Sequence, residues 1–336
     1  MPALRQRGVT GRQPPDEGGS ADADLTLLSK RAPPANAWRG KVVWIVGASQ
    51  GLGEALARYW AEAGARLILS SRSLEKLEVV KQHCCQHVAE GDVVLLPLDL
   101  VGDSAGLEAA AKAAFAAFDG AGVDFVVHNA GASQHAAAED TSPAVATALL
   151  NLNLEGPLGL ARATLPLMVA QGRGQHVVVA SMSAVVPSPG QAVYAAAKAG
   201  LRGYFQSMAS ELSDRGVGAT ICCPGPLATG GDGKPRLVYG PRGLIQQAAT
   251  GMSKKRVATA RAADLIARAA FHKLDECWIA YHPVLLLGYL MQYAPSLGMA
   301  VLKRVGPARA QALKEGRSGY DTAALIKSAS TASLRD

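Results

Sequence analysis

Short apolar runs recur along residues 42–281, and within each run apolar residues do not alternate with polar ones. Segments with the apolar spacing of helices separate consecutive runs. Strands that are apolar on both faces and interleaved with helices are typical of a parallel sheet covered on both sides. We therefore predict one α/β domain over residues 40–282, built on a doubly wound parallel sheet of about seven strands. The predicted strands are Val42–Val46, Leu67–Leu69, Val93–Leu96, Phe125–Val127, His176–Ala180, Val217–Cys222 and Trp278–Tyr281.

The residues before the first run have little apolar periodicity. Residues 1–39 contain Pro14-Pro15, Gly18-Gly19 and Pro33-Pro34, so we predict a disordered N-terminal tail. Its first 15 residues carry three Arg and no acidic residue, as organelle transit peptides do, but no apolar stretch typical of a secretory signal. We expect an intracellular protein, with a transit peptide as one alternative for the tail.

Residues 283–336 form a C-terminal extension that begins with strongly apolar sequence and ends in a polar tail. No charged residue lies between Cys277 and Leu302, and prolines 283 and 295 bracket the apolar run Val284–Tyr293. This run is shorter than the roughly 20 apolar residues of a spanning helix. It fits a pair of helices on a membrane surface or against a partner. A homodimer helix or an ordinary core helix accounts for it about as well.

Composition and charge exclude several function classes. Apolar residues make up 49% of the chain and charged residues 18%, which permits a large core, whereas 5% aromatic residues argue against a base-stacking surface. The net charge of +7 is spread along the chain without a nucleic-acid-reading motif, so we expect no nucleic-acid partner. The five cysteines have neither disulfide-framework nor zinc-site spacing, and we expect no metal.

A glycine-rich turn follows the first predicted strand and leads into a predicted helix from about Leu52 to Ala63. Glycines there let the backbone approach a pyrophosphate, and the helix N-terminus supplies N–H groups and a positive dipole end for phosphates. We predict that this turn binds a dinucleotide. The residues expected to contact it are Gly47, Ser49, Gln50, Gly51, Leu52 and Gly53.

Residues after the next three strands extend this predicted cofactor site. The second strand ends in Ser70-Ser71-Arg72, and a cation without an acidic residue at that place favours the 2′-phosphate of NADP(H) over NAD(H). Asp99-Leu100 follows the third strand, and Asp99 is predicted to accept from the adenine amino group or, alternatively, to cap a turn. Asn129-Ala130-Gly131 follows the fourth strand, where an amide either ties strands together or faces the cofactor.

Tyr194 and Lys198 are four residues apart, which places them on one face of a helix. A nearby ammonium favours the phenolate, so the pair suits acid–base chemistry. Ser181, at the end of the fifth strand, is preferred over Ser183 as the hydroxyl that binds a substrate carbonyl. Asn153 lies on the preceding helix, where its amide is expected to bend the helix and hold a water.

Together, these residues resemble those of the short-chain dehydrogenase/reductase family, which has a Rossmann-type fold. The resemblance covers about residues 40–282. It implies Asn153, Ser181, Tyr194 and Lys198 as the catalytic set, with Tyr194 and Lys198 also touching the cofactor. It adds Pro224, Gly225, Leu227 and Thr229 to the cofactor residues, with Thr229 on the carboxamide. Val46 and His128 stand where the family usually has Thr and Asn, so we expect a less firmly anchored loop near Asn129.

The segment from Trp278 to Pro295 is similar to the tail of the dehydrogenase/reductase member 7 branch, which resembles the microsomal hydroxysteroid dehydrogenases. The resemblance implies a lipophilic alcohol or carbonyl substrate and a location on the endoplasmic reticulum membrane. We therefore expect an NADP(H)-dependent oxidoreductase that interconverts an alcohol with its ketone or aldehyde. The alternative is a non-catalytic cofactor-binding scaffold that docks on a membrane or partner through its C-terminal apolar segment.

Overall fold

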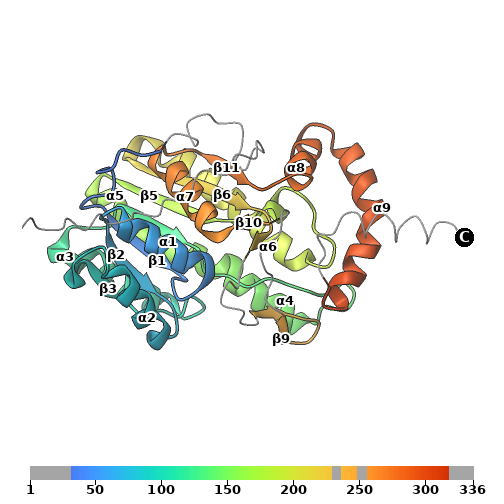
Figure 1. Ribbon diagram of the computed structural model, residues 1–336, viewed down its shortest axis with the longest axis horizontal. Coiled ribbons are helices and arrows are strands. Elements are labelled where there is room, and N and C mark those ends of the chain that lie inside the picture. The colour runs from blue at the N-terminus through green and yellow to red at the C-terminus, as the bar shows by residue number, and fades with distance from the viewer. Residues whose placement is uncertain (1–31, 229–235, 248–255, 318–336) are drawn as a thin grey trace, which may run out of the picture.

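The computed structural model describes residues 32–228, 236–247 and 256–317 (Figure 1). Its centre is a seven-stranded sheet in the order β11-β6-β5-β4-β1-β2-β3, with every neighbouring pair parallel. This confirms the predicted doubly wound sheet. The strands are β1 (Val42–Val46), β2 (Arg66–Ser70), β3 (Val93–Leu95), β4 (Phe125–His128), β5 (Gly174–Val179), β6 (Val217–Pro224) and β11 (Glu276–Ile279).

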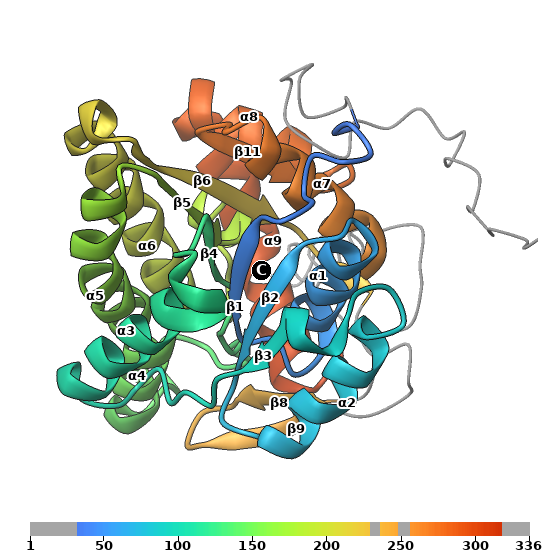
Figure 2. The ribbon, with the colours of Figure 1, turned by 90° about the vertical axis from the view of Figure 1, so that its left-hand side faces the viewer.

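Helices cover both faces of the sheet (Figure 2). One face packs against α1 (Gly51–Glu62), α2 (Leu74–Cys84) and α7 (Thr259–Phe271). The other face packs against α3 (Ser104–Gly120), α5 (Gly156–Gln171) and α6 (Ala192–Glu211). The helix α4 (Pro143–Leu150) precedes α5. Single short turns of helix lie at Glu90–Asp92, Asn151–Glu155, Met182–Ala184 and Ser213–Arg215.

The last strand begins two residues earlier than its apolar run predicts, because a charged residue belongs to it. Glu276 pairs with Ile221 of β6. Its carboxylate accepts hydrogen bonds from Arg202 and Gln206 of α6, each at 2.7 Å. These donors compensate the desolvation of the carboxylate. The charged residue Glu276 therefore lies in β11 and does not precede it.

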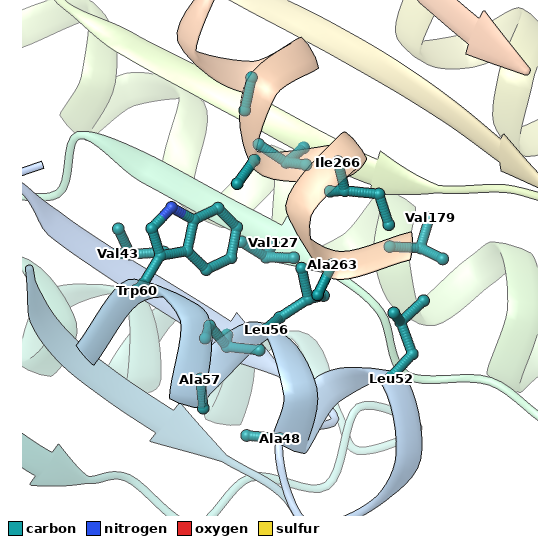
Figure 3. Packing of buried hydrophobic residues seen from close by; sticks show 14 of the residues in the cluster. Val43, Ala48, Leu52, Leu56, Ala57, Trp60, Val127, Val179, Ala263 and Ile266 are labelled. Carbon is teal, nitrogen blue, oxygen red and sulfur yellow. The ribbon is translucent and has the colours of Figure 1, made fainter. Parts of the chain in front are cut away.

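Small residues of α7 allow that helix to pack closely on α1 (Figure 3). Ala263 and Ile266 of α7 lie beside Leu56 and Trp60 of α1, and all four side chains are buried. Trp60 is fully enclosed at 0% exposure. This contact fixes the direction of α1, and with it the glycine turn at the N-terminus of that helix.

The predicted tail ends too late at residue 39, because Trp38 is part of the core. Trp38 is only 2% exposed and contacts the rings of Trp60, Phe125 and Phe271 edge-on. A buried indole of this size contributes roughly 2–3 kcal/mol through its apolar area. The folded domain therefore begins before the first strand.

The C-terminal extension forms two helices, α8 (Val284–Tyr293) and α9 (Pro295–Lys314), as its proline-bracketed pattern predicts. Leu285 and Gly288 of α8 are buried. Figure 1 shows α9 crossing one end of the molecule. Among the helices that the structure describes, none combines the length and the hydropathy needed to cross a bilayer. Two small sheets complete the described fold: β7 (Leu227–Ala228) with β10 (Val257–Ala258), and the hairpin β8 (Arg236–Tyr239) with β9 (Leu244–Gln247).

Candidate active site

Several predicted site residues follow the carboxyl ends of strands, which lie along one edge of a parallel sheet. The glycine turn follows β1, and Arg72 lies just beyond β2. Asn129 follows β4, and Ser181 follows β5. The fold therefore brings segments that are far apart in the sequence to the same edge.

The glycine turn is held by close backbone packing that leaves no room for side chains. Gly47 has a φ of +88°, and a Cβ there would lie 2.7 Å from the backbone N and Cα of Ala130. A Cβ on Gly53 would overlap the carbonyl oxygen of Gly47 and lie 2.6 Å from Nδ2 of Asn129. These glycines are required by the fold itself, apart from any ligand.

Asn129 anchors the turn. Its side-chain Nδ2 donates to the Gly47 carbonyl oxygen at 2.8 Å, and its backbone N–H donates to the Val46 carbonyl at 3.1 Å. The amide thus ties β4 to the turn after β1, the first of its two predicted roles. The effect of having Val rather than Thr at position 46 remains a prediction.

The N-terminus of α1 faces the end of this turn. Gln50 is the extended residue before the helix, and its side chain makes no capping hydrogen bond. The first N–H groups of the helix therefore lack the usual side-chain cap and are suited to phosphate oxygens. Ser49, Gln50, Gly51 and Leu52, the other residues predicted to contact the dinucleotide, all lie in this segment.

Arg72 and Asp99 lie near the predicted adenosine end. Arg72 is exposed, and within the described part of the chain no ion-pair partner competes for it. The Leu98 N–H donates to the Ser71 carbonyl at 3.1 Å, so the segments after β2 and β3 are in contact. Asp99 accepts from the Val101 N–H at 3.1 Å, the turn role named as its alternative. Leu100 is buried, and its side chain and carbonyl oxygen both face Gly156, so its contact with a cofactor remains a prediction.

Asn153 lies in a single π turn, Asn151–Glu155, between α4 and α5. Its Nδ2 donates to the Leu149 carbonyl at 3.0 Å and to the Ala132 carbonyl at 3.1 Å. Its Oδ1 accepts from the Ala132 N–H at 3.2 Å. A π turn therefore interrupts the α-helical run at Asn153, and the Asn153 amide holds the segment after Gly131 against the helix, while the bend and the bound water remain predictions.

Lys198 lies one helical turn after Tyr194 on α6. Its Nζ donates to the Val179 carbonyl at 2.9 Å and lies 5.9 Å from the centre of the Tyr194 ring. A Cβ on Gly131 would be 3.5 Å from this Nζ and 2.6 Å from Oδ1 of Asn153. Two of the four predicted catalytic residues, Asn153 and Lys198, therefore lie against the chain segment that follows β4.

Burial makes the Lys198 ammonium readily deprotonated. The side chain is only 4% exposed, and desolvation lowers its pKa from 10.5 to about 8. A thiolate at Cys223 would oppose this shift. Burial, however, raises the pKa of that thiol well above its ordinary value, so Cys223 is neutral when Lys198 titrates. Lys198 can thus change protonation state near neutral pH.

Ser181 lies at the carboxyl end of β5, two residues after the carbonyl that binds Lys198. Its Oγ accepts from the hydroxyl of Ser183 at 2.7 Å and from the backbone N–H of Ser183 at 3.1 Å. With these donors directed at it, the Ser181 hydroxyl is oriented to donate its own proton elsewhere. Ser183 thus donates to Ser181, and the choice of Ser181 as the hydroxyl that binds substrate remains a prediction.

Gln134, which is fully buried near Tyr194, was not predicted from the sequence. Its Oε1 accepts from the Tyr194 backbone N–H at 3.1 Å, and its Nε2 donates to Thr141 at 2.9 Å. Gln134 lies 60 positions from Tyr194 in the sequence, so no local spacing predicts the contact.

The cofactor residues predicted after β6 are described only in part. The Gly225 N–H donates to the Ile279 carbonyl at 2.9 Å, and a Cβ there would lie 2.8 Å from Cβ of Ala280. Pro224 ends β6 and Leu227 begins β7. Thr229, predicted to meet the carboxamide, lies outside the described residues.

His128 and His176 form a buried pair beneath this edge. Nε2 of His128 lies 2.9 Å from Nδ1 of His176, and Phe205 packs against both rings. Burial lowers the pKa of His176 to about 3 and that of His128 well below its ordinary value. Both rings are neutral at physiological pH, which agrees with a structural role for His128.

Comparison with known proteins places these features in context. The family model described as short chain dehydrogenase matches residues 41–236. The human protein "Dehydrogenase/reductase SDR family member 7" is 32% identical over 318 residues, which cover 88% of this chain and 87% of that protein. A metagenomic short-chain oxidoreductase solved in complex with NADP is 29% identical, with a TM-score of 0.55 over 70% of this chain and 92% of its own. A short-chain dehydrogenase from Streptomyces avermitilis shares the fold, with a TM-score of 0.65 at 24% identity over 80% of this chain and 98% of its own.

Proposed function

Because the chain belongs to the short-chain dehydrogenase/reductase family, we propose that it is an NADP(H)-dependent oxidoreductase that interconverts an alcohol with its ketone or aldehyde. The observation that carries this proposal is the position of Lys198, buried one turn behind Tyr194 and beside Asn153. A buried cation at that place favours ionisation of a neighbouring phenol.

The chain's own residues are suited to a dinucleotide. The contacts at Gly47 and Gly53 create a turn without side chains, and the helix behind it is uncapped. In our proposal this turn holds the pyrophosphate, Asp99 and Arg72 meet the adenosine end, and Lys198 meets the nicotinamide ribose. When bound, the nicotinamide supplies or accepts the hydride.

Ser181, which follows β5, and two residues of α6 then act on the substrate oxygen and its proton. Ser181, oriented by Ser183, donates a hydrogen bond to the substrate oxygen and positions it. Tyr194 donates its phenolic proton to that oxygen during reduction and accepts it during oxidation. The Lys198 ammonium stabilises the resulting phenolate, and the Asn153 amide holds the backbone between them.

A panel of lipophilic ketones and aldehydes, followed by loss of NADPH absorbance, tests this function. Turnover of at least one compound class supports the proposal. NADPH binding without any turnover across the panel would instead favour the non-catalytic scaffold.

The preference for NADP(H) rests on the exposed Arg72 and the lack of an acidic residue at the end of β2. We expect Arg72→Glu to weaken NADPH binding about 10–100-fold while changing NADH binding much less, because only NADPH carries the 2′-phosphate. Calorimetric titration of both cofactors gives the ratio. Arg304→Glu, the same charge change at an exposed position of α9, is the control. Equal losses for both cofactors in Arg72→Glu would contradict the assignment.

We also propose that the C-terminal helices rest on a membrane surface, which suits a lipophilic substrate. The endoplasmic reticulum is the membrane that the branch resemblance implies. The supporting observation is an apolar surface defined by residues of α8 and α9 that remain exposed: Leu286 (58%), Tyr293 (83%), Leu297 (58%) and Val301 (39%). Lys303 and Arg304 lie beside it and are exposed, which suits anionic headgroups.

Flotation with liposomes containing anionic lipid tests this surface. The wild-type chain should float with the vesicles, and the double variant Leu286→Gln/Leu297→Gln should remain largely at the bottom of the gradient. Val79→Gln, at a 50% exposed position on α2, is the control and should float like the wild type. Equal flotation of the double variant and the wild type would contradict the proposal.

A further inference from the structure

A buried arginine of the C-terminal extension contacts the segment that leads into the helix of Tyr194. The buried residues of α9 include Leu302, Gly306, Arg309 and Leu313, which recur at helical spacing and face the domain. Arg309 is only 8% exposed. A guanidinium removed from water in this way requires several acceptors, because its desolvation is costly.

Those acceptors lie in the turn before α6. Nη1 of Arg309 donates to the Pro189 carbonyl, and its Nη2 donates to Oε1 of Gln191 at 2.9 Å. Gly190, between them, has a φ of +81°, and a Cβ there would lie 2.8 Å from a methyl group of Leu313. The turn is therefore shaped to receive α9, and the planar guanidinium spans its two acceptors.

Gln191 connects Arg309 to the candidate active site. It is 5% exposed and immediately precedes α6, and its carbonyl accepts from the Ala195 N–H at 2.8 Å. Its Nε2 donates to Oγ of Ser133 at 2.8 Å, in the segment that follows Gly131. The amide thus joins the first turn of the tyrosine helix to the other side of the site.

Further hydrogen bonds connect the turn before α6 to the segment after β4. The Ala136 N–H donates to the Gly190 carbonyl at 3.0 Å. Gln134, two residues earlier, accepts from the Tyr194 N–H at 3.1 Å. The turn before α6 and the segment after β4 therefore form one hydrogen-bonded unit around Tyr194, with Arg309 donating to it from α9.

We propose that Arg309 is a positioning residue: it fixes Gln191 and thereby the start of the helix that carries Tyr194. The role in turnover rests on the proposed oxidoreductase function. The C-terminal extension would then be part of the catalytic architecture, in addition to any docking role of its outer surface. Lys314 also joins α9 to the domain, through Asp140 at 2.9 Å. That ion pair is exposed and does not touch the unit around Tyr194, which makes it a suitable control.

The test compares Arg309→Met, Arg309→Lys and Lys314→Met in the full chain. We expect kcat for carbonyl reduction to fall about tenfold or more in Arg309→Met, because small displacements of a catalytic group have effects of this size. The KM for NADPH should stay within about twofold, because the phosphate-binding turn lies at α1. Arg309→Lys keeps the charge but loses the planar pair of donors. Its kcat should lie between those of Arg309→Met and the wild type. The kcat and the KM for NADPH of Lys314→Met should match those of the wild type.

Hydrogen exchange supplies a readout that needs no turnover. Amides of residues 188–196 should exchange several-fold faster in Arg309→Met than in the wild type or in Lys314→Met. If Arg309→Met does not fold, the same comparison is made with Arg309→Lys. A wild-type chain without activity on any carbonyl would refute the oxidoreductase proposal and leave the exchange result to decide on Arg309. Wild-type kcat and wild-type exchange in the folded Arg309 variants would overturn the positioning role, as would a lower melting temperature with unchanged kcat.

Discussion

The Tyr194→Phe variant should lose carbonyl reduction by about 10²–10⁴-fold in kcat, because that range is what a positioned acid–base group contributes. Binding of NADPH should change little, since the substitution removes one oxygen and leaves the ring in place. The contact of the Tyr194 backbone with Gln134 does not depend on the side chain, so the start of α6 keeps its position. Single-turnover and steady-state rates, with cofactor titrations, separate the two effects.

Tyr204→Phe is the matched control, because Tyr204 lies ten residues after Tyr194 on the same helix and packs edge-on against Phe205. It should retain wild-type kcat. If Tyr194→Phe kept more than about a tenth of the wild-type rate, Tyr194 would not be the proton donor, since general acid–base groups contribute at least about 10²-fold.

The pH dependence of the wild type provides a second arm of this test. Burial holds the pKa of Lys198 at about 8, so its ammonium is present below that pH and is lost as the pH rises through it. The phenolate that forms during reduction then loses its neighbouring charge. We expect kcat/KM for reduction to be high below pH 8 and to fall above it, with an apparent pKa that belongs to the Tyr194–Lys198 pair. A flat profile from pH 7 to 9 would contradict this role of Lys198.

The fold was predictable because its signals are local. Each central strand is a buried apolar run that ends at a turn, so the order of elements can be predicted without knowledge of their contacts. Trp38 was missed because the residues around it are Pro, Asn, Arg and Gly, which resemble a tail in sequence. Only the tertiary contacts with Trp60 and Phe125 show that Trp38 belongs to the core.

The parts of the candidate site that have a local sequence pattern could be recognised in the same way. Tyr194 and Lys198 have a fixed helical spacing, and the glycine turn follows a strand, so both can be recognised in sequence. The residues that hold Tyr194 in place could not be found in this way. Gln134 meets Tyr194, and Arg309 meets Gln191, only in three dimensions. A Gln or an Arg in isolation is ordinarily a surface residue.

The Gly53→Ala variant should lose both stability and cofactor binding, because an added methyl group has no space. Its Cβ would overlap the Gly47 carbonyl oxygen and approach Nδ2 of Asn129 to 2.6 Å. The Gly47 carbonyl is backbone, and Nδ2 of Asn129 is held by its hydrogen bond to that carbonyl, so the turn after β1 must move. We expect the free energy of unfolding to fall by about 3 kcal/mol, the upper end of what overpacking costs. NADPH affinity should fall about 100-fold, since the displaced turn holds the pyrophosphate in our proposal.

Gly203→Ala makes the same chemical change on a helix, where an added Cβ meets nothing within 4 Å. It should raise the free energy of unfolding by about 0.5–1 kcal/mol through the better helix propensity of Ala. Its NADPH affinity should remain that of the wild type. Denaturant unfolding and calorimetric titration of both variants give the comparison. If Gly53→Ala bound NADPH normally while losing stability, the turn would be a packing feature alone, and the predicted phosphate site would lie elsewhere. If it lost neither, the close contact with the Gly47 carbonyl would be relieved by a small shift of α1, which the packing of Trp60 and Ile266 argues against.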